Sequence, residues 1–170
     1  MIFNEIRRCR MGIPRGLFRL ALFCAASILL LGFPCATGGA SMDIDLDDYQ
    51  WKNRIILVFA PSSDSEAYAR QMGEFEGEED GILDRDLVIL ELFKNGESRM
   101  GDTSLSARVA QRLRSQFNVE ADEFSIILMG KDGTVKLRSP VPVPVSEIFG
   151  RIDAMPMRQE EMRRRKNLAR

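Results

Sequence analysis

The chain has 170 residues, of which 45% are hydrophobic and 29% charged, a composition typical of a globular protein with one core. It contains no histidine, which excludes the commonest general base, the usual zinc ligand and the Ser–His and Cys–His catalytic pairs. Residues 1–40 hold five basic and one acidic side chain, so the remainder holds 19 basic and 24 acidic residues, and its net charge of −5 gives no support for nucleic-acid binding.

Residues 1–40 have the pattern of a cleavable secretory signal. Five arginines precede an apolar run from Leu20 to Phe33, which is shorter than the ~20 residues that a transmembrane helix needs. A proline ends this run and small residues follow it, so cleavage after Gly38 and cleavage after Ala40 are both open; an uncleaved anchor is the alternative. We therefore expect a periplasmic or secreted protein that meets the membrane only through this segment before cleavage.

The predicted domain organisation follows from this signal. All three cysteines lie within it, so the mature chain has no thiol and forms no internal disulfide; they are Cys9, Cys24 and Cys35. We divide the remainder into three parts: an acidic lead-in over residues 41–53, an α/β domain over 54–154 and a basic C-terminal helix or tail over 155–170.

The domain begins with a strand and a helix. Arg54–Ala60 is a continuous apolar run rich in β-branched residues, which predicts a strand buried on both faces. Ser65–Phe75 has apolar residues on one helical face, which predicts a helix after the turn at Pro61. Residues 74–86 are acidic and contain two glycines, so we expect the helix end and a solvated loop there.

A second strand and helix follow. Asp86–Phe93 is another apolar run, and residues 94–103 form a glycine-containing loop. Ser104–Phe117 carries an apolar residue at every fourth position, which predicts a helix. The alternation of strand and helix favours a parallel arrangement of the two strands.

The last part of the domain predicts a hairpin and a helix. Phe124–Met129 is a buried strand, Gly130–Gly133 is a turn, and Thr134–Arg138 alternates as a half-exposed antiparallel strand does. A proline-rich loop leads to a helix that Ser146 can cap, and the basic tail starts at Met155. The order β-α-β-α-β-β-α predicts an α/β, thioredoxin-like sandwich with a mixed four-stranded sheet and flanking helices.

Several stretches of the chain resemble one known family. They are Leu46–Arg54, Phe59–Ser62, Gly130–Gly133 and above all Ile152–Arg158 with Glu161–Arg163, whose sequences are IDAMPMR and EMR. The family is an uncharacterised domain family, a domain of unknown function, of bacterial exported proteins, and it is related to a domain in animal sushi-repeat and extracellular-matrix proteins. The resemblance covers roughly Leu46 to Arg165 and implies a thioredoxin-like fold and an exported protein, with no established activity.

Thiol redox chemistry is not expected in this chain. A redox thioredoxin needs a low-pKa thiolate at the start of the helix after the first strand and a second thiol three residues on. Alignment on Phe59 puts Ser63 and Glu66 at these two positions, and neither can form a disulfide. The proline that faces the active site of redox members is also absent from residues 119–125.

The turn after the first strand is the best candidate for ligand binding. Ser62, Ser63, Asp64 and Tyr68 lie around the predicted helix start, where free backbone N–H groups can hold an anion. The structural alternative is that Ser63 or Asp64 caps the helix. If the protein is an enzyme, then Ser63, Asp64 and Tyr68 are the local candidates, acting on a phosphorylated or carboxylated substrate.

We expect no metal and no cofactor. The acidic run 43–48 has part of the spacing of a calcium loop, but the sixth position is Asp48 where a glycine is required, and the twelfth is Arg54 where a glutamate is required. Solvated surface charge explains this run better. Three methionines, Met155, Met157 and Met162, have the chemistry for copper(I), but methionine is also a common filler of hydrophobic cores.

The basic tail is the second candidate surface. Glu160 with Arg164 and Glu161 with Arg165 are spaced for helical ion pairs, which predicts a solvated final helix. Three arginines, Arg163, Arg164 and Arg165, are the candidates for binding a partner because the rest of the mature chain is acidic. The sequence as a whole predicts a non-catalytic module that binds an unknown protein or a small ligand, with an enzyme or small-anion binder as the alternative.

Overall fold

The computed structural model describes residues 41–168. The predicted secretory signal and both of its possible cleavage positions lie outside these residues. Within the described part, no helix is both long enough and apolar enough to cross a membrane.

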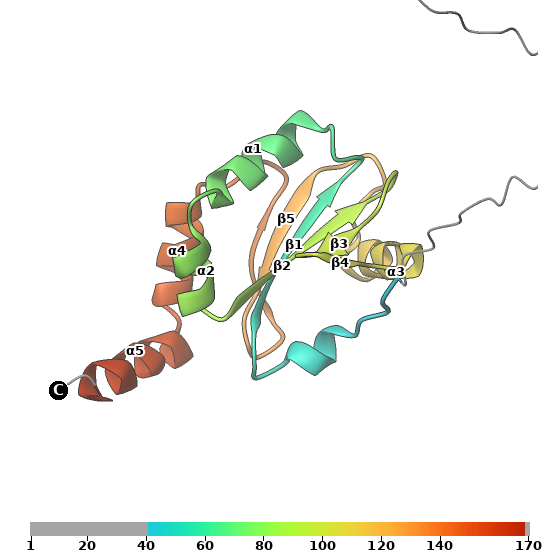
Figure 1. Ribbon diagram of the computed structural model, residues 1–170. Coiled ribbons are helices and arrows are strands. Elements are labelled where there is room, and N and C mark those ends of the chain that lie inside the picture. The colour runs from blue at the N-terminus through green and yellow to red at the C-terminus, as the bar shows by residue number, and fades with distance from the viewer. Residues whose placement is uncertain (1–40, 169–170) are drawn as a thin grey trace, which may run out of the picture. The chain divides into compact units, whose positions relative to one another are not determined.

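A six-stranded mixed sheet forms the centre of the domain, in the order β4-β3-β2-β1-β5-β6 (Figure 1). The strands are β1 (Arg54–Ala60), β2 (Leu87–Phe93), β3 (Arg99–Met100), β4 (Thr103–Ser104), β5 (Ser125–Met129) and β6 (Val135–Ser139). β1 runs parallel to β2 and antiparallel to β5, and β6 pairs antiparallel with β5. The predicted parallel pair and the predicted hairpin are both confirmed.

The predicted count of four strands is wrong. The two additional strands, β3 and β4, form a short antiparallel hairpin that extends the sheet beyond β2. Each is two residues long and polar or half-exposed, so neither has the apolar run by which the other strands are detected. The pairing of β3 with β2 therefore depends on the folded chain bringing them together and has no signal in the local sequence.

Helices cover both faces of the sheet. They are α1 (Glu66–Phe75), α2 (Glu79–Asp84), α3 (Ala107–Phe117), α4 (Val145–Asp153) and α5 (Pro156–Leu168), with a short 3-10 helix, η1 (Leu46–Tyr49). Figure 1 shows α1, α2 and α4 on one face and α3 with η1 on the other. The acidic stretch expected to be a loop therefore contains α2, and α3 starts three residues later than predicted because β4 takes Thr103 and Ser104.

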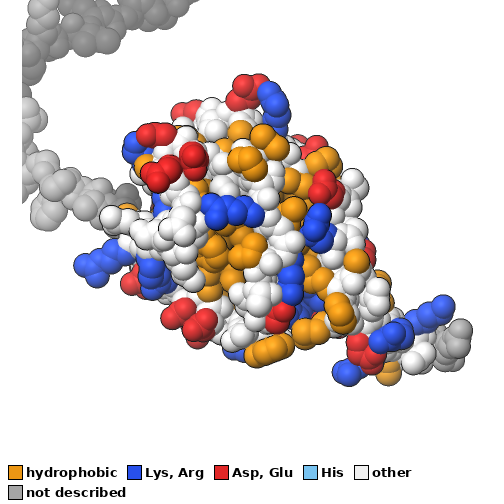
Figure 2. All heavy atoms as spheres, turned by 180° about the vertical axis from the view of Figure 1, so that it is seen from behind, with side chains coloured by type: hydrophobic (Ala, Val, Ile, Leu, Met, Phe, Trp, Pro, Cys, Tyr) orange, Lys and Arg blue, Asp and Glu red, His pale blue; other side chains and the backbone are white. Residues whose placement is uncertain are grey.

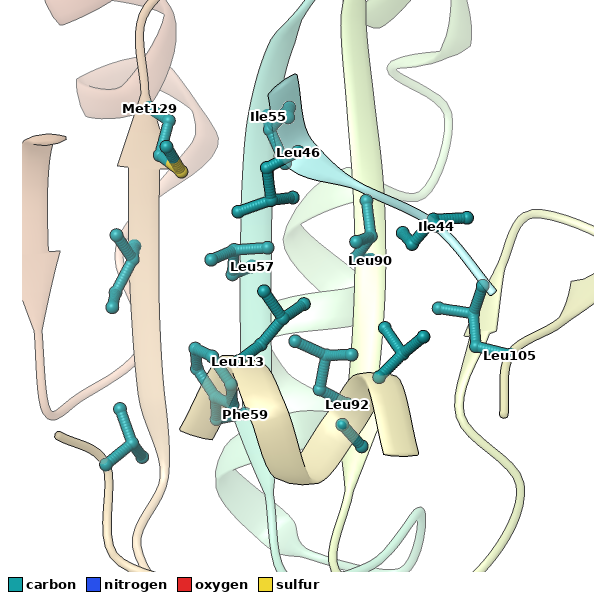
Figure 3. Close-up of a cluster of buried hydrophobic side chains, with 14 residues drawn as sticks. Ile44, Leu46, Ile55, Leu57, Phe59, Leu90, Leu92, Leu105, Leu113 and Met129 are labelled. Atoms are coloured by element: carbon teal, nitrogen blue, oxygen red, sulfur yellow. The ribbon is translucent and has the colours of Figure 1, made fainter. Parts of the chain in front are cut away.

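The core has two halves, one on each side of β1. All seven residues of β1 are buried, as the apolar run predicts. Ile55, Leu57 and Phe59 contribute to the half beneath α3 and η1, and Figure 3 shows Phe59 next to Leu113 of α3. The intervening residues Ile56, Val58 and Ala60 contribute to the half beneath α1 and α4. This alternation is the two-residue period of a strand with both faces covered.

The first turn of α4 differs from the prediction. Pro144 is the N-cap residue and the helix begins at Val145, so Ser146 lies inside the first turn and does not cap it. Proline is tolerated at the N-cap because the N–H of that residue takes no part in the helix, whereas the carbonyl of Pro144 accepts a hydrogen bond from the N–H of Ile148 at 3.2 Å.

Candidate functional site

The turn after β1 lies at the surface. Ser63 and Asp64 are exposed and Ser62 is half-buried. Helix α1 starts at Glu66 with Ser65 as its N-cap residue, and no side chain of the cap position bonds the helix backbone. Neither Ser63 nor Asp64 therefore occupies the capping position. The alignment on Phe59 placed Ser63 at the start of this helix. Ser63 instead precedes the first helical turn, so the helix dipole acts on it less strongly.

Tyr68 is oriented away from this turn. It is buried, its ring packs edge-on against Phe93 with centroids 4.9 Å apart, and its hydroxyl donates a hydrogen bond to Glu91. Arg99 donates to the same hydroxyl at 3.2 Å and forms an ion pair with Glu91 at 2.9 Å. Of the four predicted ligand residues, Ser62, Ser63 and Asp64 remain together, whereas the polar end of Tyr68 is committed to Glu91 and Arg99.

Burial is the main cause that raises the pKa of Tyr68, and the hydrogen bond to Glu91 raises it further. The hydrogen bond with Glu91 also raises the pKa of Arg99. The tyrosine therefore stays protonated as a donor and the arginine stays charged. One sequence signal pointed to this trio: Glu91 is a charged residue inside an otherwise apolar strand, and such residues are rarely buried without a partner.

A cavity of about 540 Å³ lies at the carboxyl ends of β1 and β2. One wall is the end of β2 with the loop that follows it; its lining residues include Phe93, Lys94, Glu97 and Ser98. The other is the face of α3 that bears Ala107, Gln111 and Arg114. The turn with Ser62 belongs to the same edge of the sheet, because Lys94 and Asn95 donate backbone hydrogen bonds to Ala60 and Pro61. Ligands of open α/β sheets bind at such carboxyl ends.

Arg114 carries the positive charge at this cavity. Its side chain is buried, and it donates to the carbonyl oxygens of Ala60 at 2.6 Å, Leu92 at 3.0 Å and Glu120 at 3.0 Å. Its Nε–H has no hydrogen-bond partner, and no carboxylate of residues 41–168 forms an ion pair with it. The guanidinium thus holds the ends of both parallel strands, and three of its five N–H donors are used.

Burial lowers the pKa of Arg114, and the nearby Asp122 opposes this shift. Asp122 itself is paired with Lys94 at 2.8 Å. An arginine nevertheless remains protonated in proteins, so a buried cation that has no ion-pair partner among residues 41–168 lines this cavity, together with Lys94 and Glu97. Sequence reasoning missed Arg114 because nothing in the helical pattern distinguishes it from the neighbouring solvent-facing arginines of α3.

The predicted basic surface of the tail is partly neutralised by its own chain. Arg163 and Arg164 both pair with Glu160, at 2.6 Å and 3.1 Å, and Arg165 pairs with Asp84. Figure 2 shows acidic and basic side chains next to each other on the projecting part of α5. The predicted pair of Glu160 with Arg164 forms, whereas the predicted pair of Glu161 with Arg165 does not.

Glu161 instead points inward to a group of ion pairs that holds α5 to the domain. Arg54, at the start of β1, bonds it at 3.2 Å, and Lys131 bonds it at 2.8 Å. Lys131 also pairs with Asp86 at 2.8 Å. Because Arg54 is fully buried and lies far from Glu161 in sequence, this contact attaches the tail to the centre of the sheet.

Arg158 completes this group, which we call the motif cluster: Arg54, Asp84, Arg85, Asp86, Lys131, Asp153, Arg158 and Glu161. Arg158 is buried and pairs with Asp84 and, at 3.1 Å, with Asp153. Burial alone would raise the pKa of Asp153, but hydrogen bonds from Arg85 and Arg158 outweigh it and lower that pKa. The most specific motif of the sequence therefore serves attachment of the tail.

The acidic lead-in also has structural partners. Asp45 accepts a hydrogen bond from the backbone of Asp47 as the N-cap of η1, and Asp43 accepts one from the Ser106 hydroxyl at 2.8 Å. Within the described residues, no group of three or more His, Cys, Asp or Glu side chains is arranged to hold a metal ion. Met155 packs against the core, and Met157 and Met162 are exposed.

A family model described as "Domain of unknown function (DUF4174)" matches residues 45–161. Zebrafish "Coiled-coil domain-containing protein 80" is 28% identical over 138 residues, covering 72% of this chain and 16% of that protein. Human "Sushi repeat-containing protein SRPX" is 29% identical over 120 residues, covering 69% of this chain and 26% of that protein. The chain thus spans about a quarter or less of the length of these curated relatives.

Solved structures with a similar fold include peroxiredoxins. The reduced 2-Cys peroxiredoxin of Plasmodium vivax superposes with a TM-score of 0.54 at 14% identity, covering 69% of this chain and 85% of that one. Mycobacterium tuberculosis AhpC superposes with a TM-score of 0.52 at 16% identity, covering 66% of this chain and 74% of that one. At such identities the likeness shows the fold alone, and it confirms the predicted α/β, thioredoxin-like class.

Proposed function

The chain belongs to the DUF4174 family of domains of unknown function, and from this family's fold and the cavity beside Arg114 we propose that the protein is an exported, non-redox thioredoxin-like binding module. Its ligand is a small molecule or a peptide end that carries a carboxylate or a phosphate group. The observation that carries this proposal is the buried guanidinium of Arg114, which lines the cavity and forms no ion pair within residues 41–168.

The non-redox part rests on the amino-acid sequence. Residues 41–170 contain no cysteine, so no thiol is available at Ser63, at Glu66 or elsewhere in the domain. A related protein with cysteines at these two positions would have the thiols that this chain lacks. Export rests on the arginine-rich and apolar pattern of residues 1–40.

The ligand class follows from the charge at the cavity. Removing a guanidinium from water is costly unless it gains strong partners, and three backbone carbonyls compensate only part of that cost. A carboxylate or phosphate supplies both a negative charge and acceptors in the planar geometry that arginine prefers. The first turn of α3, which also lines the cavity at Ser106 and Ala107, adds backbone donors for an extended anionic ligand.

Binding is favoured over catalysis by the position of Tyr68. An enzyme working at the start of α1 would need a base or an acid near Ser63, and with the tyrosine hydroxyl bonded to Glu91 and Arg99, the exposed Asp64 is the only one of the predicted candidates left for that role. Ser62, Ser63 and Asp64 remain a proposed part of the binding surface, because their turn and the cavity share one edge of the sheet.

A charge substitution in the wall of the cavity tests this proposal. Gln111 lines the cavity one helical turn from Arg114, so Gln111→Glu places a carboxylate where the ligand anion would bind. We expect acetate, succinate or inorganic phosphate to bind the purified protein in a calorimetric or NMR titration, and Gln111→Glu to weaken that binding about tenfold, or about 1.4 kcal/mol. Gln116→Glu, at an exposed position of α3 outside the cavity, is the matched control and should leave affinity unchanged.

Binding of none of the three anions by the wild-type protein would contradict the proposal. So would equal weakening by Gln111→Glu and Gln116→Glu, because the effect would then come from overall charge alone.

A further inference from the structure

The outer edge of β2 is covered over only part of its length. β3 pairs with β2 at Leu90 and Glu91 and then leaves the sheet at the turn before β4. Leu87, Val88 and Ile89, the first three residues of β2, have no neighbouring strand on that side among the described residues. A sheet edge of this kind can accept another strand.

The backbone of two residues points out of this edge. The N–H of Arg54 bonds the carbonyl of Asp86 at 2.9 Å, which sets the phase of the parallel ladder between β1 and β2. N–H and C=O groups alternate in direction along a strand, so those of Val88 point to β1 and those of Leu87 and Ile89 point outward. The N–H of Phe93 also points outward, because it donates to the Ser98 hydroxyl at 2.9 Å. Phe93 is an even number of residues from Leu87 and Ile89, so this direction agrees with theirs.

An open apolar groove of about 590 Å³ runs along the same edge. Met72, Phe75 and Ile82, from α1 and α2, form one wall, and Tyr49 and Met100 form the other. The Tyr49 hydroxyl bonds the sulfur of Met100 at 3.2 Å, which joins the second wall into one unit. The walls lie on opposite faces of the sheet, where the alternating side chains of an added strand would point.

The groove has an acidic rim. Glu76 and Glu79 line it and are exposed, and neither forms an ion pair within residues 41–168. Glu78 and Asp80 are their neighbours in sequence, so this side of the groove carries concentrated negative charge. This charge disfavours a second copy of the chain as the occupant, because that copy would bring an identical acidic rim against this one and the two rims would repel each other.

We propose that this groove, defined by Leu87–Ile89 with its two apolar walls and its acidic rim, binds an extended segment of a partner protein as an added β-strand. The segment has apolar residues at alternating positions and lysine or arginine between them. Backbone hydrogen bonds to Leu87 and Ile89 give it direction, and the wall formed by Tyr49 and Met100 takes its hydrophobic side chains. Its basic side chains lie on the opposite face of the strand, along the wall from α1 and α2, where Glu76 and Glu79 pair with them. This site shares no lining residue with the cavity beside Arg114. It therefore extends the proposed function, and the two proposals are tested independently.

A model peptide tests the proposal on the purified protein. The probe is a blocked nonapeptide that alternates valine and lysine, and its counterpart of equal length alternates valine and glutamate. We expect the lysine peptide to shift the amide resonances of Leu87 and Ile89 and to slow their hydrogen exchange, and the glutamate peptide to do neither.

Two variants separate the charge from the strand pairing. Glu76→Gln with Glu79→Gln should weaken binding of the lysine peptide about five- to tenfold, whereas Glu66→Gln, at the far end of α1 and outside the groove, should not. Ile89→Pro removes an outward N–H without removing a bond to β1, so it should abolish binding while circular dichroism stays native.

Several results would overturn the proposal. They are resonance shifts confined to other elements, equal affinity for the glutamate peptide, native binding by folded Ile89→Pro, and a concentration-dependent dimer without peptide in sedimentation experiments that Ile89→Pro converts to a monomer. The last would assign the edge to a second copy of the chain.

Discussion

Arg158 is 2% exposed and yet carries a full charge. Burial opposes that charge, but hydrogen bonds to Asp153 and Asp84 outweigh the cost and raise the pKa of Arg158. Arg54 has a similar environment, with Glu161 and the carbonyl of Arg85 as its partners. At the scale of single residues, the charges of the motif cluster are mutually dependent, so deleting one removes part of the compensation of its partners.

We therefore expect Arg158→Met to destabilise the domain by about 3 kcal/mol, because the carboxylates of Asp84 and Asp153 lose their buried partner. Arg163→Met is the control, since Arg163 pairs with Glu160 on the exposed face of α5, and its effect should stay below about 0.5 kcal/mol. Guanidinium unfolding followed by circular dichroism measures both. Similar midpoints for the two variants would show that the motif cluster does not hold the tail.

At the scale of elements, α2 explains why the acidic stretch between α1 and β2 is ordered. A side chain at Gly81 would meet the Phe149 ring of α4 at 2.7 Å, so α2 and α4 approach closely through a residue without a side chain. Arg85, just after α2, lies over the same ring at 4.1 Å. Few local apolar residues are needed for α2, because these contacts with α4 support it.

Two glycine substitutions should therefore have opposite effects. Gly73→Ala in α1 has open space around the new methyl group and should stabilise the domain by about 0.5–1 kcal/mol through helix propensity. Gly81→Ala gains the same propensity but pushes Phe149 aside, so we expect a net loss of about 1–2 kcal/mol. Thermal unfolding of both variants measures the difference, and stabilisation by Gly81→Ala would refute the close approach.

At the scale of the whole molecule, a thioredoxin-like sheet is retained without the thiols that such a sheet often presents. The carboxyl ends of β1 and β2 still meet at an open edge, but a buried arginine and hydroxyl groups stand there. A second surface lies at the incompletely covered edge of β2. We propose both as recognition surfaces.

Export can be measured directly on the natural protein. We expect mass spectrometry of the envelope and medium fractions to find a chain that begins at Gly39 or Ser41, after removal of the signal. Replacing Gly38 and Ala40 together by leucine should leave the uncleaved chain, because signal peptidase requires small residues near the cleaved bond. Changing Gly38 or Ala40 alone is the control, since it should shift cleavage to the remaining site. An uncleaved wild-type chain would indicate a membrane anchor.

Local pattern was sufficient for the framework of this fold. β1, β2, β5 and β6 were each predicted to within about two residues, because a strand buried on one or both faces must carry its apolar residues in a continuous run or in alternation. The order of these elements then predicted the thioredoxin-like class, which the superposition on peroxiredoxins confirms.

The amino-acid sequence by itself thus determined the main strands, the helices α1 and α3, the absence of thiols from residues 41–170 and the family. Only the tertiary structure decided where the polar groups go: Tyr68 to Glu91, Glu161 to Arg54 and Arg114 to the strand ends. The reason is physical. Periodicity shows whether a side chain is buried, but a buried polar group must find a particular partner, and that partner comes from a distant segment that only the packed chain brings within hydrogen-bonding distance.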